Sequence, residues 1–235
     1  SKMKKLLYLL LFINFLNATE RIITLSPAIN EIAFALGLGD KIIANTEFCD
    51  FPIESKNIQK VGGYGSVSLE KVVNLNPTII LNQDYDKKLN QSLKDLNFKT
   101  LVYKTNSLED IKFTIKDLGE VFNKKEEAKD LNNQIENSLE SLKNIIENQK
   151  ILIVISPQST LSNQIFVVGN FIYFEDIIKA SNNINAYQSS LKSQPSINSE
   201  KLITLNPDII ILLAPYLKDD KEKDDMLNLW KKLPV

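Results

Sequence analysis

The chain has 235 residues, 43% of them hydrophobic, which is enough for one large or two smaller domains with packed cores. It carries 28 basic and 29 acidic side chains, a formal net charge of −1, and therefore no basic surface that would attract nucleic acid. The only cysteine, Cys49, excludes an internal disulfide and is expected to be buried.

Residues 1–18 are predicted to be a cleavable export signal. Ser1-Lys2 precede the first methionine and are read as an expression remnant, two lysines follow Met3, and residues 6–16 are predominantly apolar. This stretch is too short to cross a bilayer, which needs roughly 20 residues. Ala18 offers a small residue at the cleavage point, with no cysteine after it for lipid attachment. We expect a periplasmic protein, with an uncleaved anchor as the alternative.

Strand and helix patterns alternate through the rest of the chain and predict parallel βαβ units with helices on both faces of the sheets. In residues 19–123 strands are expected at 21–25, 41–44, 78–81 and 100–103, and a glycine turn at 61–65. In residues 150–235 strands are expected at 150–155 and 164–168, a helix at 173–180, a polar loop at 182–195 and a solvated, charged turn at 219–225. By comparison with the first half, a further strand and helix are expected beyond Val235.

An internal repeat relates the two halves. Residues 66–82 reappear without a gap as residues 196–212, at a constant offset of 130. Each copy reads as an N-capped helix, an Asn-Pro turn and a buried strand, which predicts two similar lobes. The identical positions are Ser66, Glu70, Lys71, Leu75, Asn76, Pro77, Ile79 and Ile80 in the first copy.

Residues 124–149 are predicted to form one long helix that connects the lobes. Apolar residues fall on a single narrow stripe at a 3.6-residue period, and no Gly or Pro interrupts the run. An ordinary surface helix or a coiled-coil arm is the alternative. The expected fold is therefore α/β, with two lobes that each hold a parallel central sheet flanked by helices, bridged by one long α-helix.

Catalysis is poorly supported by the sequence. There is no histidine for general-base or metal chemistry, no cysteine pair, no nucleophile elbow and no phosphate loop. A glycosidase-type carboxylate pair remains open, but no spacing singles out two acids. We expect a binding protein without enzyme activity, cofactor or metal site of its own.

Several motifs resemble one family of transport proteins. These motifs are residues 24–27, Glu31, residues 49–52, Gly62-Gly63, residues 68–70, residues 75–77 and Leu118-Gly119. In combination they resemble the periplasmic solute-binding proteins of ABC importers for cobalamin, haem and ferric siderophores, and within that family the pattern is closest to the cobalamin-binding members. The resemblance covers residues 21–235 and implies two α/β lobes bridged by a long helix.

The resemblance implies a role for two repeated acids. In the family, an acid of each lobe docks into arginine pockets of the inner-membrane permease, and Glu70 and Glu200 occupy those positions here. The alternative is that each acid only interacts with the dipole of its helix, which is worth about 0.3–1 kcal/mol.

The resemblance also implies ligand-binding residues between the lobes, with limited hinge motion on capture. Tyr64, Phe48 and Phe166 match aromatic positions, whereas Gln83 and Gln194, with Tyr85 close by, stand where the cobalamin pattern has tryptophans. We expect a monomer that delivers a corrinoid to an ABC importer. A haem, ferric-siderophore or other metal-chelate carrier is the alternative, and a ligand-sensing or assembly protein without a transport role is a rival of another class.

Overall fold

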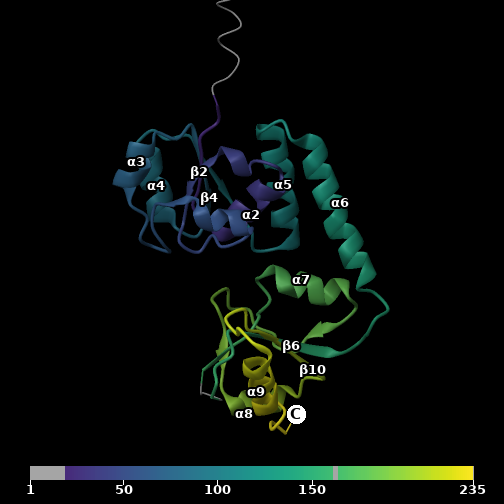
Figure 1. Cartoon of the computed structure of the whole chain (residues 1–235). Helices are drawn as coiled ribbons and strands as arrows, with labels where there is room; N and C mark the ends of the chain where they lie inside the picture. The colour runs from purple at the N-terminus through teal and green to yellow at the C-terminus, as the bar shows by residue number, and fades with distance from the viewer. Residues whose placement is uncertain (1–18, 161–163, 235) are drawn as a thin grey trace, which may run out of the picture. The chain divides into compact units, whose positions relative to one another are not determined.

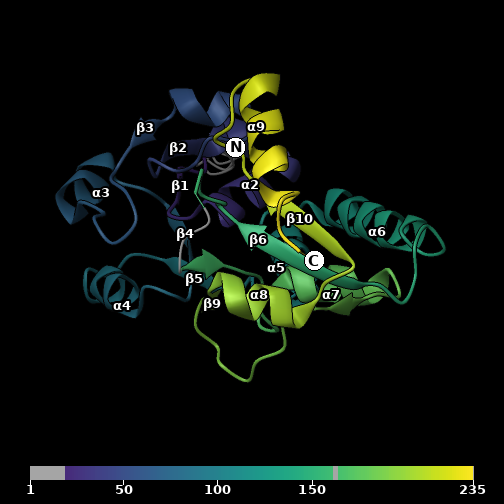
Figure 2. The same ribbon diagram turned by 90° about the horizontal axis from the view of Figure 1, so that it is seen from below.

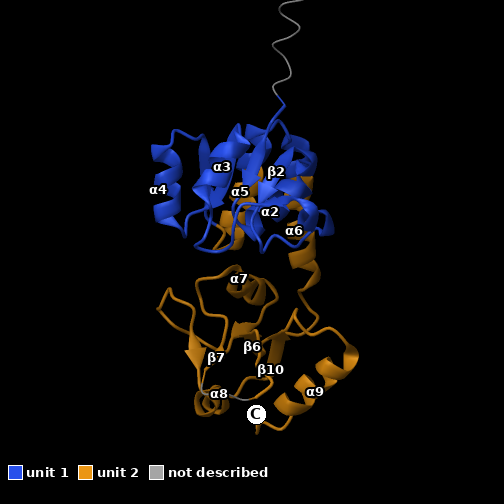
Figure 3. Cartoon of the chain, turned by 60° about the vertical axis from the view of Figure 1, so that its left-hand side comes forward, with its two compact units in different colours: residues 1–104, 117–128 blue, residues 105–116, 129–235 orange. Residues whose placement is uncertain are grey.

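The computed structural model describes residues 19–160 and 164–234, so the predicted export signal lies outside the described residues. The chain divides into two compact units (Figure 3). Unit 1 comprises the residues up to Lys104 together with Asp117–Ala128, and unit 2 comprises Thr105–Lys116 and the residues from Lys129 onward. The chain therefore passes from one unit to the other three times, whereas the sequence suggested a single connecting segment.

Unit 1 is built on a five-stranded sheet in which all neighbouring strands are parallel. The strand order is β3-β2-β1-β4-β5, as Figure 2 shows across this unit. Along the chain the elements are β1 (Ile22–Thr24), α2 (Pro27–Ala35), η1 (Gly39–Lys41), β2 (Ile42–Asn45), η2 (Ile53–Asn57), β3 (Gln59–Lys60), α3 (Leu69–Leu75), β4 (Ile79–Gln83), α4 (Lys87–Asp95) and β5 (Thr100–Tyr103).

The central strands of this sheet are mainly apolar and end on polar residues, Thr24 in β1 and Asn82-Gln83 in β4. β1 is buried at every position, and Ile79, Ile80 and Leu81 of β4 are buried beside it. Continuous apolar strands are typical of parallel sheets covered by helices on both faces. Cys49 is buried, as expected.

Two antiparallel helices follow, α5 (Leu108–Val121) and α6 (Lys125–Ser141) (Figure 1). They pack closely at Gly119, where a Cβ atom would lie 2.5 Å from the Cβ of Ala128. The Asn132 side chain also donates to the carbonyl of Lys112 at 3.0 Å. Helix α6 ends at Ser141 rather than at Gln149, so the predicted connecting helix is too long at its C-terminal end.

The chain after α6 leaves the helix, with Asn144 at a positive φ of 63°, and other groups bind its backbone. The Asn183 side chain donates to the carbonyl of Ile146, and the Asn148 N–H donates to the carbonyl of Asn182, both at 2.9 Å. Asn148 itself has a positive φ of 58°. Ile145 is 67% exposed, so the apolar stripe that predicted the helix has no core to cover here.

Unit 2 contains a three-stranded parallel sheet in the order β10-β6-β8 and an antiparallel pair, β7 with β9. Its elements are β6 (Lys150–Ile155), β7 (Ile165–Phe166), α7 (Tyr173–Ala180), β8 (Ile184–Asn185), β9 (Ser196–Ile197), α8 (Ser199–Leu205), β10 (Ile209–Leu213) and α9 (Asp220–Trp230). The antiparallel pair was not predicted, and β8 lies within the stretch expected to be a loop. The α/β class with parallel central sheets is confirmed.

The charge run at 219–225 begins a helix and is not a turn. Asp219 caps α9 by accepting the Glu222 N–H at 2.8 Å, and the Glu222 side chain accepts the Lys218 N–H at 2.8 Å. Met226 and Trp230 of this helix are buried. A reciprocal cap followed by apolar residues four positions apart is a helix signal that the density of charge obscured.

The repeat predicted from the sequence forms the same structure in both units. Helices α3 and α8 each have seven residues, and each ends on an asparagine in the left-handed conformation, Asn76 at φ 47° and Asn206 at φ 46°. Each is followed by a strand, β4 or β10, that pairs in parallel with the first strand of its unit's sheet.

Candidate ligand-binding site

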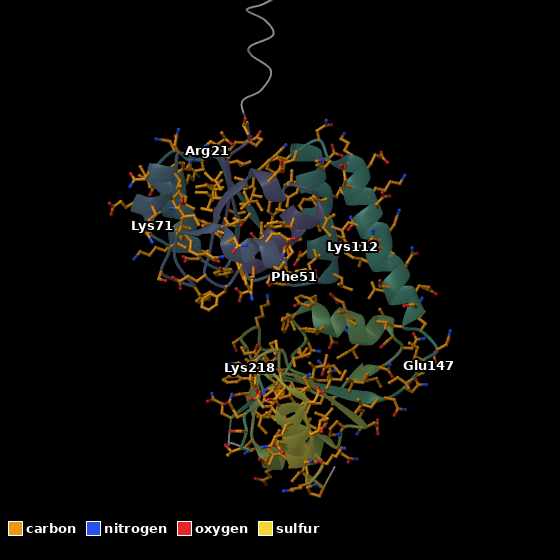
Figure 4. The ribbon with its side chains drawn as sticks, viewed as in Figure 1. Arg21, Phe51, Lys71, Lys112, Glu147 and Lys218 are labelled. Carbon is orange, nitrogen blue, oxygen red and sulfur yellow. The ribbon has the colours of Figure 1, made fainter. Side chains whose placement is uncertain are left out.

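The loops at the carboxyl edge of the unit 1 sheet carry most of the predicted ligand-binding residues. Because the strands are parallel, the ends of β1, β2, β4 and β5 meet at this edge, the usual place for ligands in α/β sheets. Phe48 follows β2, whereas Gln83 is the last residue of β4 and Tyr85 comes directly after it. Figure 4 shows Phe51, from the loop after β2, and Arg21, which precedes β1, at opposite edges of unit 1.

Tyr64 and Tyr85 are brought together. Their rings stack with centroids 5.1 Å apart and planes inclined by 19°. Tyr64 is 73% exposed and Tyr85 43% exposed, so the pair presents ring surface to solvent. The Tyr85 hydroxyl donates to the carbonyl of Leu25 at 3.5 Å, and burial, with lesser contributions from Tyr64 and Asp86, raises the pKa of Tyr85.

A glycine turn presents Tyr64. Gly62 has φ 135°, and a Cβ atom there would lie 2.2 Å from the carbonyl oxygen of Ser66, so only glycine fits. The Gly63 N–H donates to the Ser66 hydroxyl at 3.2 Å and closes the turn. Sequence reasoning identified this turn correctly as the element that carries Tyr64.

Phe48 lies against the same turn. A Cβ atom on Gly63 would lie 3.4 Å from the Phe48 ring, and the Glu47 N–H donates to the carbonyl of Gly62 at 2.9 Å. Phe48 is 59% exposed. We call Phe48, Tyr64 and Tyr85 the aromatic surface; it can pack against a flat apolar ligand.

Gln83 lies at the base of this edge. It pairs in register with Tyr103, and its carbonyl accepts from the Asn90 side chain at 2.9 Å. Its position is compatible with a polar contact beside the aromatic surface.

In unit 2, Gln194 binds the backbone of Val167, the residue after Phe166. Phe166 belongs to β7 and remains partly exposed, while the Gln194 side-chain amide donates to the carbonyls of Val167 at 2.8 Å and Pro195 at 3.1 Å. The amide N–H groups of Gln194 therefore hold its own loop against β7.

Sequence reasoning missed a pocket in unit 2. Its volume is about 620 Å³, and it lies where β6 and β10 end, lined by Ser156, Gln158, Tyr216, Glu222, Asp225 and Met226. The Tyr216 hydroxyl donates to the carbonyl of Pro157, and both residues line the pocket. Applying the carboxyl-edge rule to the second copy of the repeat would have directed attention to this place.

Glu70 and Glu200 occupy equivalent exposed positions in the first turns of α3 and α8. Each follows a capping residue: Ser68 accepts the Lys71 N–H at 3.3 Å, and Asn198 accepts the Lys201 N–H at 2.7 Å. Within the described parts of the chain neither glutamate forms a salt bridge. Both carboxylates are therefore available to a partner.

A second pair of equivalent contacts was not predicted. Arg21, before β1, donates to the carbonyls of Leu75 at 2.6 Å and Asn76 at 3.2 Å, at the end of α3. Lys150, at the start of β6, donates to the carbonyl of Leu205 at 3.3 Å, at the end of α8. A positively charged side chain thus binds the C-terminus of the repeat helix in each unit, where the helix dipole favours positive charge.

Two classes of feature are absent from residues 19–160 and 164–234. No cluster of three or more metal-binding side chains occurs among them. None of their helices combines the length and the apolarity required to cross a membrane.

Comparison with known proteins agrees with this architecture. The model of the family described as "Periplasmic binding protein" matches residues 22–229. The "Vitamin B12-binding protein" of Vibrio parahaemolyticus is 26% identical over 234 residues, 96% of this chain and 82% of that protein. The "High-affinity heme uptake system protein IsdE" of Staphylococcus aureus is 28% identical over 184 residues, 76% of this chain and 61% of that protein.

Among solved structures, the periplasmic vitamin B12-binding protein BtuF of Vibrio cholerae is similar in fold. The TM-score is 0.74 at 21% sequence identity, and the match covers 90% of this chain and 82% of that one.

Proposed function

Because this chain belongs to the periplasmic binding protein family, we propose that it captures a corrinoid of the cobalamin type and delivers it to an inner-membrane ABC importer. The observation that carries the ligand part of the proposal is the aromatic surface of unit 1. Three exposed aromatic rings at the carboxyl edge of a parallel sheet suit the flat face of a large ring, with polar groups placed to bind its periphery. Gln83, Phe166 and Gln194 are proposed as further contacts.

Haem is the second candidate, and a specific feature of the chain favours it. The haem-uptake protein of Staphylococcus aureus has a comparable sequence identity, 28% against 26%, over a shorter part of this chain, 76% against 96%. The chain has no histidine, but a tyrosine can ligate haem iron, and Tyr64 and Tyr85 are exposed side by side. An anionic siderophore is less well matched, since Arg21 is the only arginine and it binds the end of α3.

Delivery to a permease is proposed through Glu70 and Glu200. Their equivalent positions, exposure and lack of salt bridges within the described chain support contact with basic groups on a partner. Export by residues 1–18 and action as a monomer complete the proposal.

Calorimetric titration with cyanocobalamin and then with haemin tests the ligand. Burial of one large apolar side chain is worth about 1.5–3 kcal/mol, so Tyr64→Ala is expected to weaken binding by roughly tenfold to 150-fold. Leu96→Ala is the control, because Leu96 is an exposed apolar residue that follows α4, away from the carboxyl edge. Equal affinities of wild type and Tyr64→Ala for whichever probe binds would refute the site.

Uptake in cells that carry the cognate permease tests the partner. A variant with Glu70→Lys and Glu200→Lys is expected to bind ligand normally in vitro and to lose uptake. Normal uptake by this variant would refute docking through these two acids, whereas ligand binding without any uptake by the wild-type protein would favour the rival role in sensing or assembly.

A further inference from the structure

The loop between β2 and β3 bears Phe48 and Phe51, two exposed aromatic side chains. Its backbone must therefore be held from within the unit. Asn30 of α2, Asn45 of β2 and Ser55 of the loop itself are fully buried.

These buried polar groups bind the loop backbone and one another. The Asn30 side chain donates to the carbonyl of Phe51 at 3.2 Å and to the Ser55 hydroxyl at 2.7 Å. The Asn45 side chain donates to Asn30 Oδ1 and to the carbonyl of Ser55, both at 3.2 Å. The network thus ties the end of β2 and helix α2 to the far side of the loop.

Three acceptors, one of them the Ser55 carbonyl that Asn45 also binds, converge on the ammonium group of Lys60. Its Nζ donates to Asn45 Oδ1 at 2.7 Å, to the carbonyl of Ser55 at 3.0 Å and to the carbonyl of Cys49 at 3.3 Å. The three acceptors match the three N–H donors of an ammonium, whereas a water molecule could satisfy only two of them. Cys49 lies next to Phe48, so one of these bonds holds the part of the loop that reaches the aromatic surface.

We propose that Lys60 is a positioning residue for the ligand, because its ammonium fixes the loop that carries Phe48 against the turn that carries Tyr64. This inference rests on the proposed function. The link between the two segments is the Glu47 N–H bond to the carbonyl of Gly62, together with the packing of the Phe48 ring at Gly63. Without the ammonium, the carbonyls of Cys49 and Ser55 lose a charged donor and the loop loses its fixed conformation.

A lysine on an edge strand also discourages unwanted strand pairing, and β3 is an edge strand. That role requires only a charge at the edge. The three bonds to oxygens inside the unit are specific to a positioning role, and the two roles predict different responses to an added amine.

The test is hydrogen exchange of the Lys60→Ala protein, with Lys56→Ala as the matched control. Lys56 is an exposed lysine of η2 within the same loop, so its removal makes the same change in charge. In Lys60→Ala the amides of Cys49 and Ser55, which donate to Thr46 and Pro52, are expected to lose nearly all of their protection against exchange. The amides of β5 should be unchanged in both variants.

Propylammonium chloride should restore slow exchange to Lys60→Ala, since it replaces the missing atoms and their three donors. Tetramethylammonium chloride at the same concentration has no N–H donor and should not. Should Lys60→Ala unfold the unit, Lys60→Met keeps the apolar stem and serves for the exchange and affinity comparisons. Unchanged loop exchange, or equal effects of the two salts on Lys60→Ala, would overturn the proposal.

Affinity for cyanocobalamin and haemin completes the test. If the ordered loop falls to about one-tenth of the population, the affinity of the probe that binds falls about tenfold, and propylammonium recovers it. A loosened loop with unchanged affinity would overturn the positioning role and leave the proposed function intact. Failure of both probes to bind the wild-type protein would instead overturn the proposed function and the ligand-positioning role with it, while exchange still decides whether Lys60 holds the loop.

Discussion

Replacing Gly119 by alanine tests the close packing of α5 on α6. The added Cβ would lie 2.5 Å from the Cβ of Ala128 and 3.0 Å from the carbonyl oxygen of Lys124. Overpacking of this kind costs about 1–3 kcal/mol, and the better helix propensity of alanine returns about 1 kcal/mol. We therefore expect Gly119→Ala to lower the free energy of unfolding by about 1 kcal/mol.

The matched change Ala128→Gly separates the clash from the propensity effect. Alone it loses about 1 kcal/mol of helix propensity and about 0.8 kcal/mol from one buried methyl group. In the double variant the Cβ–Cβ clash is gone, so its stability should exceed the sum of the single effects by about 2 kcal/mol.

Urea unfolding followed by circular dichroism at 222 nm measures all four proteins. Helix content is the suitable signal, because the single tryptophan, Trp230, belongs to unit 2 whereas Gly119 and Ala128 belong to unit 1. Additive single effects, or a Gly119→Ala protein more stable than wild type, would refute this account of the helix pair.

Two further substitutions test local features of the two units. The Tyr103 hydroxyl donates to the Asp117 carboxylate at 2.6 Å. Burial, and to a lesser extent this bond, raises the pKa of Tyr103. The hydroxyl therefore contributes its full stabilisation below the ordinary tyrosine pKa near 10, and this stabilisation declines at higher pH. Tyr103→Phe should lower the free energy of unfolding by about 1–3 kcal/mol at pH 7. When the pH rises from about 9 to 11, the variant should lose less stability than the wild-type protein loses. Equal pH slopes of the two proteins in urea unfolding would contradict this. Asn206→Ala should cost about 1–2 kcal/mol because of the left-handed φ at that position, whereas Asn206→Gly should cost little; equal melting temperatures for the two variants would contradict it.

The repeat and the alternation of elements were predictable because they depend on local sequence. Two copies of an N-capped helix, an Asn-Pro turn and an apolar strand form the same structure in either unit. The glycine turn at Tyr64 was predictable for the same reason, since Gly62 meets a steric requirement within five residues of sequence.

Features that depend on distant groups were not predictable from the pattern. Helix α6 stops at Ser141 although its apolar period continues; Asn144 has a positive φ, and Asn182 and Asn183 bind the backbone at Asn148 and Ile146. The stacking of Tyr64 on Tyr85 and the three bonds of Lys60 likewise join segments whose proximity only the folded sheet determines.

The central claim is that the aromatic surface of unit 1 receives the ligand. The most direct test is hydrogen exchange of the wild-type protein with and without a saturating concentration of the probe that binds, cyanocobalamin or haemin. We predict that the ligand slows exchange in residues 47–49, 62–66 and 83–86, which surround Phe48, Tyr64 and Tyr85. Ligand-dependent protection that leaves these three segments unchanged would contradict the account.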